Sequence, residues 1–270
     1  MNKAKYEKNK AKEPSLLGAK LSLGPKEELL NFISQRLASK KKTIVASGNA
    51  HSYNLSYEMP WFRAFLNVSD WVRMDGIGVI MAARLLGYSV SASARMTWAD
   101  FMWDLALFCE RHAISLYFLG GRPGVGEKAA TNLKNRFKDL RIVGIQHGYF
   151  HKRHGSSENG ALINRINLVK PDILVVGFGM PLQERWLVDN VDHLNVNVTF
   201  TAGAVFDYVS GELRRPPLWV TKNGLEWMGR LAIEPKRLWR RYLIGNFKFF
   251  IRVVKQRMNC KSFQSRSPDL

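Results

Sequence analysis

The chain has 270 residues, 46% of them apolar, which is enough to bury the core of one large domain, with or without an appendage. Its formal net charge of +19 predicts an anionic partner surface, either a membrane or a nucleic acid. Two cysteines argue against a disulfide framework, and neither a secretory signal nor a run of about 18 apolar residues is visible. We therefore expect a protein of the reducing cytosol without a membrane-spanning helix.

The first predicted elements are a tail, a helix and a strand. Residues 1 to about 14 are rich in lysine and poor in apolar side chains, which predicts a disordered basic tail, and we place the end of this tail at residue 20. Apolar residues at helical spacing predict an amphipathic helix over residues 27–38, and a β-branched run predicts a strand over residues 42–46. Ser47 and Asn49 follow this strand. Their hydroxyl and amide can hold phosphate or sugar oxygens, or they can cap the next helix, and the sequence leaves both uses open.

Asp75 lies at the next predicted junction between a strand and a helix. Residues 71–74, apolar except for Arg73, precede it, and two glycines and a helical run through Leu86 follow it. A carboxylate in this place is either the N-cap of the helix or a general base that takes a proton from a hydroxyl. The sequence does not separate these two uses. Arg95 precedes the following helix and is available to an anion.

Glycine-rich turns follow the later predicted strands. The turn at residues 120–124, GGRPG, offers backbone N–H groups to phosphate, but it lacks the Lys-Ser/Thr of a P-loop and the spacing of GxGxxG. The apolar strand 173–177 ends in another glycine turn, after which Gln183 lies at the start of a helix. Further strands are predicted over residues 141–145 and 196–201. Because ligands bind beyond the carboxyl ends of parallel strands, polar residues after these strands are site candidates.

The order of elements predicts the fold class and the domain organisation. Strands and helices alternate at least five times, which predicts an α/β, Rossmann-like fold with a mostly parallel sheet and helices on both faces. Residues 213–257 instead interleave aromatic residues with twelve Lys or Arg residues. They predict a basic helical appendage that either faces a membrane or caps the sheet. We expect a combination, in which one part packs on the core and another part faces lipid. The expected organisation is a disordered tail at 1–20, a Rossmann-like catalytic domain at 21–212, a membrane-associating C-terminal appendage at 213–257 and a tail at 258–270.

Five motifs occur in a characteristic order along the chain. They are Asp75-Gly76, the turn at 120–124, GMPLQE at 179–184, GAVFDY at 203–208 and the block GLEWMGRLAIEPKRLWRRYL at 224–243. Together they resemble the bacterial TagA/WecG/CpsF glycosyltransferases, glycosyltransferase family 26, over about residues 21–251. Each short motif is unspecific, and the order of the motifs with the long last block carries the resemblance.

The resemblance implies an inverting, metal-independent enzyme without a cofactor. Such an enzyme moves a sugar from a UDP-sugar donor to a polyprenyl-diphosphate-linked saccharide. The implied setting is the cytoplasmic face of the plasma membrane, where the enzyme is peripheral, and the implied product is a surface polysaccharide: teichoic acid, common antigen or exopolysaccharide. The chain agrees in having no Asp-X-Asp triplet of the kind that holds a divalent ion against a nucleotide diphosphate.

The resemblance also assigns roles to individual residues. Asp75 matches the general base that deprotonates the acceptor hydroxyl. The remaining matches are Ser47 and Asn49 beside the site, with serine for the usual threonine; Arg95 and Gln183 near the donor diphosphate and sugar; Tyr149 and Asp207 at the nucleoside; and Arg230, Arg237 and Arg240 closing over the departing diphosphate. Trp98 lies near a position where the family commonly has glycine, so its bulky ring is expected to reshape the donor pocket.

Two other functions remain as alternatives. A nucleic-acid-binding protein would use the basic ends of the chain, but no RNA- or DNA-binding motif is visible, so no nucleic acid is expected as a partner. A Rossmann-type oxidoreductase would carry a regular GxGxxG with an acidic ribose partner, which is not visible either. The expected partners are the UDP-sugar donor, the polyprenyl-diphosphate-linked acceptor and an anionic membrane surface. Assembly into a homo-oligomer away from the membrane is left open.

Overall fold

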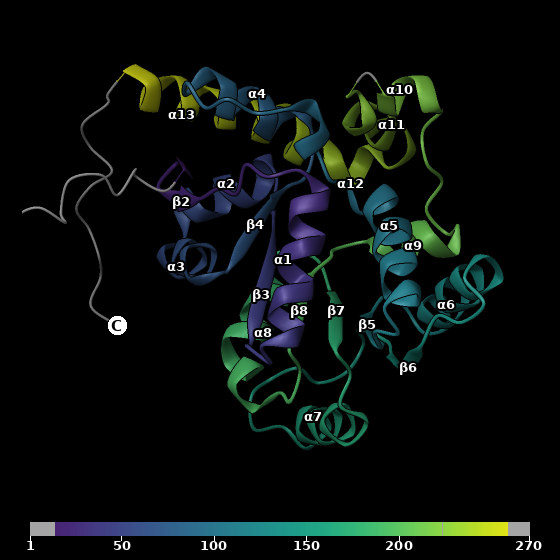
Figure 1. Cartoon of the computed structure of the whole chain (residues 1–270). Coiled ribbons are helices and arrows are strands. Elements are labelled where there is room, and N and C mark those ends of the chain that lie inside the picture. The colour runs from purple at the N-terminus through teal and green to yellow at the C-terminus, as the bar shows by residue number, and fades with distance from the viewer. Residues whose placement is uncertain (1–13, 223, 259–270) are drawn as a thin grey trace, which may run out of the picture.

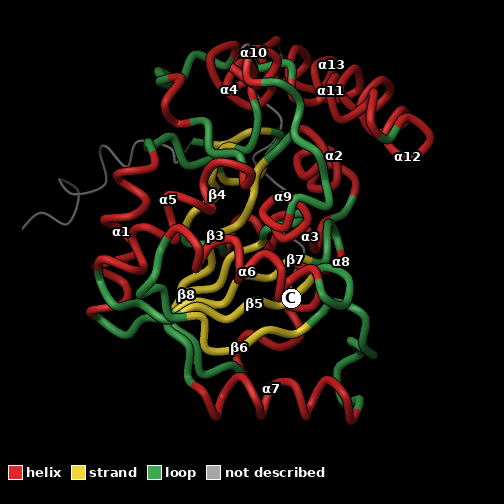
Figure 2. Tube along the Cα trace, turned by 90° about the vertical axis from the view of Figure 1, so that its right-hand side faces the viewer, coloured by secondary structure: helices red, strands yellow, loops and turns green. Residues whose placement is uncertain are grey.

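The chain folds around a six-stranded parallel sheet with helices on both faces, which confirms the predicted fold class (Figure 1 and Figure 2). The computed structural model describes residues 14–222 and 224–258. The strand order is β4-β3-β8-β7-β5-β6, and all neighbours are parallel. The strands are β3 (Thr43–Gly48), β4 (Trp71–Met74), β5 (Leu116–Gly120), β6 (Ile142–Gln146), β7 (Ile173–Gly177) and β8 (Val198–Thr201). All six therefore end at the same edge of the sheet.

The helices connect successive strands and continue beyond the last one. Those up to β8 are α1 (Lys26–Ala38), α2 (Ala50–Glu58), α3 (Pro60–Val68), α4 (Ile77–Leu85), the 3-10 helix η2 (Ala92–Ala94), α5 (Trp98–Arg111), α6 (Val125–Arg136), α7 (Ser157–Val169), α8 (Leu182–Asn190) and the 3-10 helix η3 (Val191–His193). Those after β8 are α9 (Val205–Ser210), α10 (Leu218–Lys222), α11 (Glu226–Ile233), α12 (Pro235–Trp239), the π-helix η4 (Arg240–Ile244) and α13 (Gly245–Met258).

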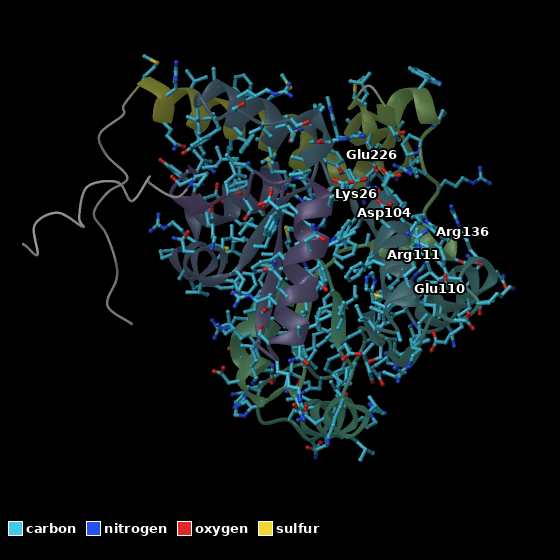
Figure 3. The ribbon with its side chains drawn as sticks, viewed as in Figure 1. Lys26, Asp104, Glu110, Arg111, Arg136 and Glu226 are labelled. Carbon is cyan, nitrogen blue, oxygen red and sulfur yellow. The ribbon has the colours of Figure 1, made fainter. Side chains whose placement is uncertain are left out.

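Side chains alternate along the strands and fill a separate apolar layer on each face of the sheet. In β7, Leu174 belongs to the layer that includes α2, α3, α7 and α8, and Ile173 belongs to the layer that includes α1, α5, α6 and α9. On the second face, an ion pair of 2.8 Å between Lys26 and Asp104 joins α1 to α5 (Figure 3). Because both faces of the sheet are covered, β7 is buried throughout and its sequence is an unbroken apolar run.

Two glycines let neighbouring strands approach each other at the carboxyl edge of the sheet. Gly120 ends β5 with a φ of +146°, and a Cβ on it would lie 2.3 Å from the carbonyl oxygen of Gly177. Gly177 ends β7, and a Cβ there would lie 2.8 Å from the carbonyl oxygen of Gly203. Neither position has room for a side chain, so three strand-end turns meet here as bare backbone.

Residues 213–258, which we call the C-terminal segment, cross the carboxyl edge of the sheet and end in α13, beside α2 and α4 (Figure 1 and Figure 2). Phe249 and Val253 of α13 are fully buried, and the Phe249 ring lies 6.5 Å from that of Tyr53. Asn54 Nδ2 donates a hydrogen bond of 2.7 Å to the Gly245 carbonyl. The last helix therefore completes the core. Among the described helices, none is long and apolar enough to cross a bilayer.

The structure differs from the prediction at the N-terminus. Ser15–Leu16 (β1) and Ala19–Lys20 (β2) form an antiparallel hairpin, and Leu16 and Leu17 are fully buried. The backbone N–H of Leu17 donates a hydrogen bond of 2.8 Å to Gln256 Oε1 of α13. The partner of this hairpin lies more than two hundred residues away, which is why composition alone assigned it to the disordered tail. Residues 1–13 and 259–270, which hold the rest of the two predicted tails, lie outside the described residues.

Candidate active site

A cavity of about 1300 Å³ lies at the carboxyl edge of the sheet. Residues that follow each of the six strands line one side of it, and residues of α11, α12, η4 and α13 line the other side. Pockets for a single small molecule usually measure about 300–1000 Å³, so this cavity has room for two ligands at once. It also lies where ligands bind in open α/β sheets, beyond the carboxyl ends of parallel strands.

Asp75 lines this cavity from the turn between β4 and α4. Its backbone N–H donates a hydrogen bond of 2.8 Å to the Gly48 carbonyl, which fixes the turn to the end of β3. The N-cap of α4 is Gly76, and no side chain caps that helix. Of the two uses that the sequence left open for Asp75, the structure therefore does not show the cap. Within the described residues the carboxylate receives no hydrogen bond, so it is available to a ligand.

Ser47, the second-last residue of β3, lines the cavity, but its hydroxyl bonds within the protein. Ser47 Oγ donates to the Thr201 carbonyl at 2.7 Å and accepts from Arg73 Nη2 at 2.7 Å and from Trp98 Nε1 at 3.1 Å. The Arg73 guanidinium is fully buried and lies 4.3 Å from the Trp98 ring centroid. Burial lowers the pKa of Arg73 to about 10, although Asp75 opposes this shift. Ser47 thus holds Trp98 in the cavity wall, while the effect of this ring on the donor stays a prediction.

Asn49 and His51 line the cavity at the start of α2. Asn49 Oδ1 caps this helix by accepting from the N–H groups of His51 and Ser52, both at 3.0 Å. Within the described residues the cap uses only Oδ1 and no hydrogen bond of Nδ2 occurs, so the two uses predicted for this residue are compatible. Burial and the charge of Arg241 lower the pKa of His51 to about 4, against a raising effect of Glu58. His51, which the motifs did not single out, is therefore neutral at neutral pH.

Arg95, Asp207 and Tyr208 extend the polar wall towards the C-terminal segment. Arg95 Nη1 donates a hydrogen bond of 3.0 Å to the Thr221 carbonyl, which ties the wall to α10. Asp207 and Tyr208 lie on α9, and burial raises the pKa of the Tyr208 hydroxyl, so that it stays protonated. The guanidinium of Arg230 lies 5.4 Å from the Tyr208 ring. Two candidates that lie far apart in the sequence, Arg95 and Asp207, therefore line the same cavity.

Tyr149 and Lys152 lie on the rim of the cavity after β6. The Tyr149 side chain is 67% exposed, so its ring is accessible to a planar ligand. Lys152 Nζ lies 4.7 Å from the Phe150 ring and 4.9 Å from the Phe178 ring, and burial lowers the pKa of this ammonium group. Lys152 had no signal in the sequence, because a lysine in a basic loop is indistinguishable there from a solvated one.

Gln183 does not line the cavity, in contrast to the contact with the ligand that the resemblance implied. Its side chain is fully buried below the wall. Gln183 Oε1 accepts hydrogen bonds from the N–H of Gly179 at 3.2 Å and from the N–H of Gly203 at 2.9 Å, and its Nε2 donates to Glu184 Oε1 at 2.7 Å. Gln183 therefore joins the turns after β7 and β8 and acts on the cavity through their backbone.

Replacing Gln183 with leucine is expected to destabilise the fold by about 2–4 kcal/mol, because two partly buried backbone N–H groups lose their acceptor and each costs about 1–2 kcal/mol. Nucleotide binding should weaken with it, since the two turns that Gln183 joins line the cavity. Chemical denaturation and calorimetric titration with UDP measure the two effects. Gln35→Leu, on the exposed side of α1, is the matched control. Unchanged stability in Gln183→Leu would show that the two turns hold their shape without this side chain.

The arginines of the C-terminal segment differ in their positions. Arg230 lines the cavity, with its side chain only 15% exposed and Nη2 3.9 Å from Glu234 Oε2. Arg240 does not line it: this residue is exposed, and its guanidinium lies 5.3 Å from the Trp239 ring. The next residue, Arg241, lines the cavity instead. The π-helical geometry of η4 sets which residues face inward, and a sequence pattern based on an α-helix does not reveal it. The predicted role of Arg237 falls on a side chain outside the described ones.

The comparison with known proteins agrees with this arrangement. The family model of the glycosyl transferase WecG/TagA/CpsF family matches residues 14–262. The chain is 28% identical over 199 residues to the N-acetylglucosaminyldiphosphoundecaprenol N-acetyl-beta-D-mannosaminyltransferase of Bacillus subtilis (strain 168), which covers 73% of each chain. It is 24% identical over 232 residues to the enzyme of the same name from Staphylococcus aureus (strain MRSA252), with 86% of this chain and 87% of the relative covered.

The match covers both the sheet that carries Asp75 and the C-terminal segment that carries Arg230 and Arg241. The match covers most of each relative, and both relatives are named as glycosyltransferases. The cavity is lined by residues of the sheet and of the C-terminal segment, which both lie in the matched region. The predicted resemblance is thereby confirmed, and with it the class of enzyme. The chain belongs to the glycosyl transferase WecG/TagA/CpsF family.

Proposed function

We propose that this glycosyltransferase moves a sugar from a UDP-sugar to a saccharide carried on polyprenyl diphosphate. One observation supports this proposal most strongly: a carboxylate without a hydrogen-bond partner among the described residues, that of Asp75, shares a cavity with Arg95, Arg230 and Arg241. The carboxylate suits a base, and the guanidinium groups suit a diphosphate. The relatives' names give N-acetylglucosaminyl diphosphoundecaprenol as acceptor and N-acetylmannosamine as transferred sugar. These are therefore the first substrates to test.

In the proposed reaction, Asp75 accepts the proton of an acceptor hydroxyl while that oxygen forms a bond to the anomeric carbon of the donor. The bond between this carbon and the UDP oxygen breaks on the opposite face, which inverts the anomeric centre. The electron pair of the broken bond stays on the diphosphate, whose growing charge Arg95, Arg230 and Arg241 neutralise. The three arginines come from two sides of the cavity, so they also align the diphosphate.

The donor would occupy the cavity with its nucleoside towards β6 and α9. Tyr149 offers a ring for stacking and Asp207 a carboxylate that accepts hydrogen bonds from the nucleoside, as the resemblance implies. Asn49 Nδ2 would donate to a sugar or phosphate oxygen. Ser47 and Gln183 would act by position, because their polar atoms already bond within the protein. Trp98, with its indole fixed by Ser47, would limit the size of the donor sugar.

The transfer itself tests the proposal. Purified protein would be incubated with UDP-N-acetylmannosamine, and in parallel with other UDP-sugars, in the presence of a polyprenyl-diphosphate-linked N-acetylglucosamine. We expect a product that is larger by one sugar and has the inverted anomeric configuration, and we expect the same rate with EDTA as without it. Hydrolysis of the UDP-sugar without transfer, or dependence on a divalent ion, would contradict the proposal.

We also infer that the C-terminal segment and α4 face an anionic membrane. Their exposed apolar residues include Met81, Leu85, Trp219, Leu243, Ile244, Phe247, Ile251, Val254 and Met258. Exposed cations lie among them in the sequence: Lys236, Arg240, Lys248, Lys255 and Arg257. Apolar groups that enter the interface, together with cations that meet anionic headgroups, hold a peripheral protein to a membrane. A position at the cytoplasmic face of the plasma membrane would bring the cavity to its lipid-linked acceptor.

Replacing Ile251 and Val254 with serine is expected to weaken binding to vesicles of phosphatidylcholine and phosphatidylglycerol by about tenfold or more, because each apolar side chain contributes on the order of 1 kcal/mol when buried. Both are partly exposed on α13 and neither lines the cavity, so transfer to a soluble acceptor analogue should persist. Vesicle flotation measures the binding. Leu168→Ser/Val169→Ser on α7, at the opposite end of the molecule, is the matched control (Figure 1). Equal flotation of both variants would argue that α13 does not face the lipid.

A further inference from the structure

Glu226 is a second carboxyl group in the cavity, and neither the motifs nor the proposed reaction gives it a role. It is the first residue of α11, in the part of the C-terminal segment that lies above the carboxyl edge of the sheet (Figure 3). Its Oε2 atom is shielded from solvent and has no hydrogen-bond partner among the described residues. A buried carboxylate oxygen without a partner is unfavourable in an empty site, because nothing replaces the water that it has lost.

Several charged side chains lie within electrostatic range of Glu226. Burial raises the pKa of its carboxyl group, the nearby Asp75 raises it further, and Arg215 and Arg95 lower it against a raising effect of Asp100. Arginines are thus within electrostatic range, but none bonds to the carboxylate in the described part of the chain. Burial and the charge of Glu226 raise the pKa of the Tyr208 hydroxyl. Glu226 and Asp75 therefore line the same cavity, each within electrostatic range of the other.

A carboxylate in this position is suited to a sugar and not to a diphosphate. It repels the phosphate oxygens, whereas it accepts hydrogen bonds readily from hydroxyl groups. The hydroxyl that Asp75 deprotonates has neighbouring hydroxyls on the same sugar ring. A second carboxylate beside the first can therefore accept a hydrogen bond from one of these neighbours.

We propose that Glu226 binds the acceptor sugar, by accepting a hydrogen bond from a hydroxyl next to the one that Asp75 deprotonates. This inference rests on the proposed transfer to a lipid-linked saccharide. The contact would satisfy the partnerless Oε2 atom and would fix the orientation of the sugar, so that only one hydroxyl reaches Asp75. Because Glu226 lies on α11, the acceptor would bridge the sheet and the C-terminal segment.

Steady-state kinetics with two kinds of acceptor test this contact. The first acceptor is the normal polyprenyl-diphosphate-linked sugar, and the second is a pair of analogues, each lacking one hydroxyl next to the nucleophile. Glu226→Ala is expected to lower kcat/KM for the normal acceptor by roughly 10- to 100-fold, the loss of one hydrogen bond to a charged group. With one of the two deoxy analogues, kcat/KM of the wild-type enzyme should fall by a similar factor. The same analogue should lower kcat/KM of Glu226→Ala hardly any further. Affinity for the UDP-sugar should not change.

The inference would be overturned by additive losses. In that case each deoxy analogue would lower kcat/KM of Glu226→Ala by the same factor as it lowers kcat/KM of the wild type. A merely structural role would lower turnover with every acceptor alike, so non-additivity separates the two. Glu226→Gln keeps the shape of the side chain and serves if the alanine variant does not fold. Glu127→Ala, on the exposed side of α6, is the matched control. If the wild-type enzyme makes no product from any lipid-linked sugar, the proposed function itself fails, and this inference fails with it.

Discussion

Replacing Asp75 with asparagine is expected to lower the rate of transfer by roughly 10²- to 10⁴-fold, the usual contribution of a positioned base. Asparagine has nearly the same shape but cannot accept the proton of the acceptor hydroxyl. The Asp75 carboxylate makes no hydrogen bond within the described residues, so its loss should not disturb the fold. Product formation measures the rate, and calorimetric titration with UDP-sugar measures binding, which should stay within a few-fold of the wild-type value.

Asp139→Asn serves as control for this experiment, because Asp139 is exposed before β6 and does not line the cavity. It should transfer sugar at the wild-type rate. Substantial turnover by Asp75→Asn would remove Asp75 from the role of base. The neutral imidazole of His51, which lines the same cavity, would then be the next group to replace.

Arg241→Ala is expected to reduce transfer by roughly 10²- to 10³-fold, the cost of removing one group that stabilises developing charge. Arg241 lines the cavity, whereas its neighbour Arg240 points its guanidinium at the Trp239 ring and is exposed. Arg240→Ala should therefore transfer sugar to a soluble acceptor analogue at close to the wild-type rate. Turnover is measured for both variants. Thermal denaturation of both shows whether unfolding contributes to any loss of turnover.

The pair of arginine variants also tests the geometry of the C-terminal segment. The family resemblance favours Arg240, and the structure favours Arg241, one residue further along η4. A large loss in Arg240→Ala together with normal turnover in Arg241→Ala would mean that the segment turns its other side to the diphosphate. Equal large losses would mean that both guanidinium groups reach the cavity when substrate is bound.

The parallel sheet could be predicted because its strands are unmistakable in the sequence. The run at β7 is apolar throughout, since both faces of the sheet are covered, and it ends in a glycine turn. The packing of α13 could not be predicted in the same way. Its buried Phe249 packs near Tyr53, and its Gln256 accepts a hydrogen bond from Leu17 in the hairpin. Local patterns carry no information about such distant contacts.

The candidate site shows the same limit. The position of Asp75 after a strand was enough to place it at the carboxyl edge, and the structure puts it in the cavity wall. The roles of Ser47 and Gln183 depend on hydrogen bonds with residues far away in the chain, such as Thr201 and Gly203, so sequence reasoning assigned both side chains to the ligand. Glu226 carried no signal either, because a glutamate in the first turn of a helix is ordinarily a favourable charge at the N-terminus.

A crystal structure of the complex with UDP would show directly how the cavity holds the donor. We predict that uridine lies against Tyr149 and Asp207, that the diphosphate contacts Arg95, Arg230 or Arg241, and that the Asp75 carboxylate faces the free side of the terminal phosphate across a gap that fits a sugar. UDP bound outside this cavity, or bound inside it with Asp75 on the far side of the nucleotide, would contradict the proposed role of Asp75 as the base.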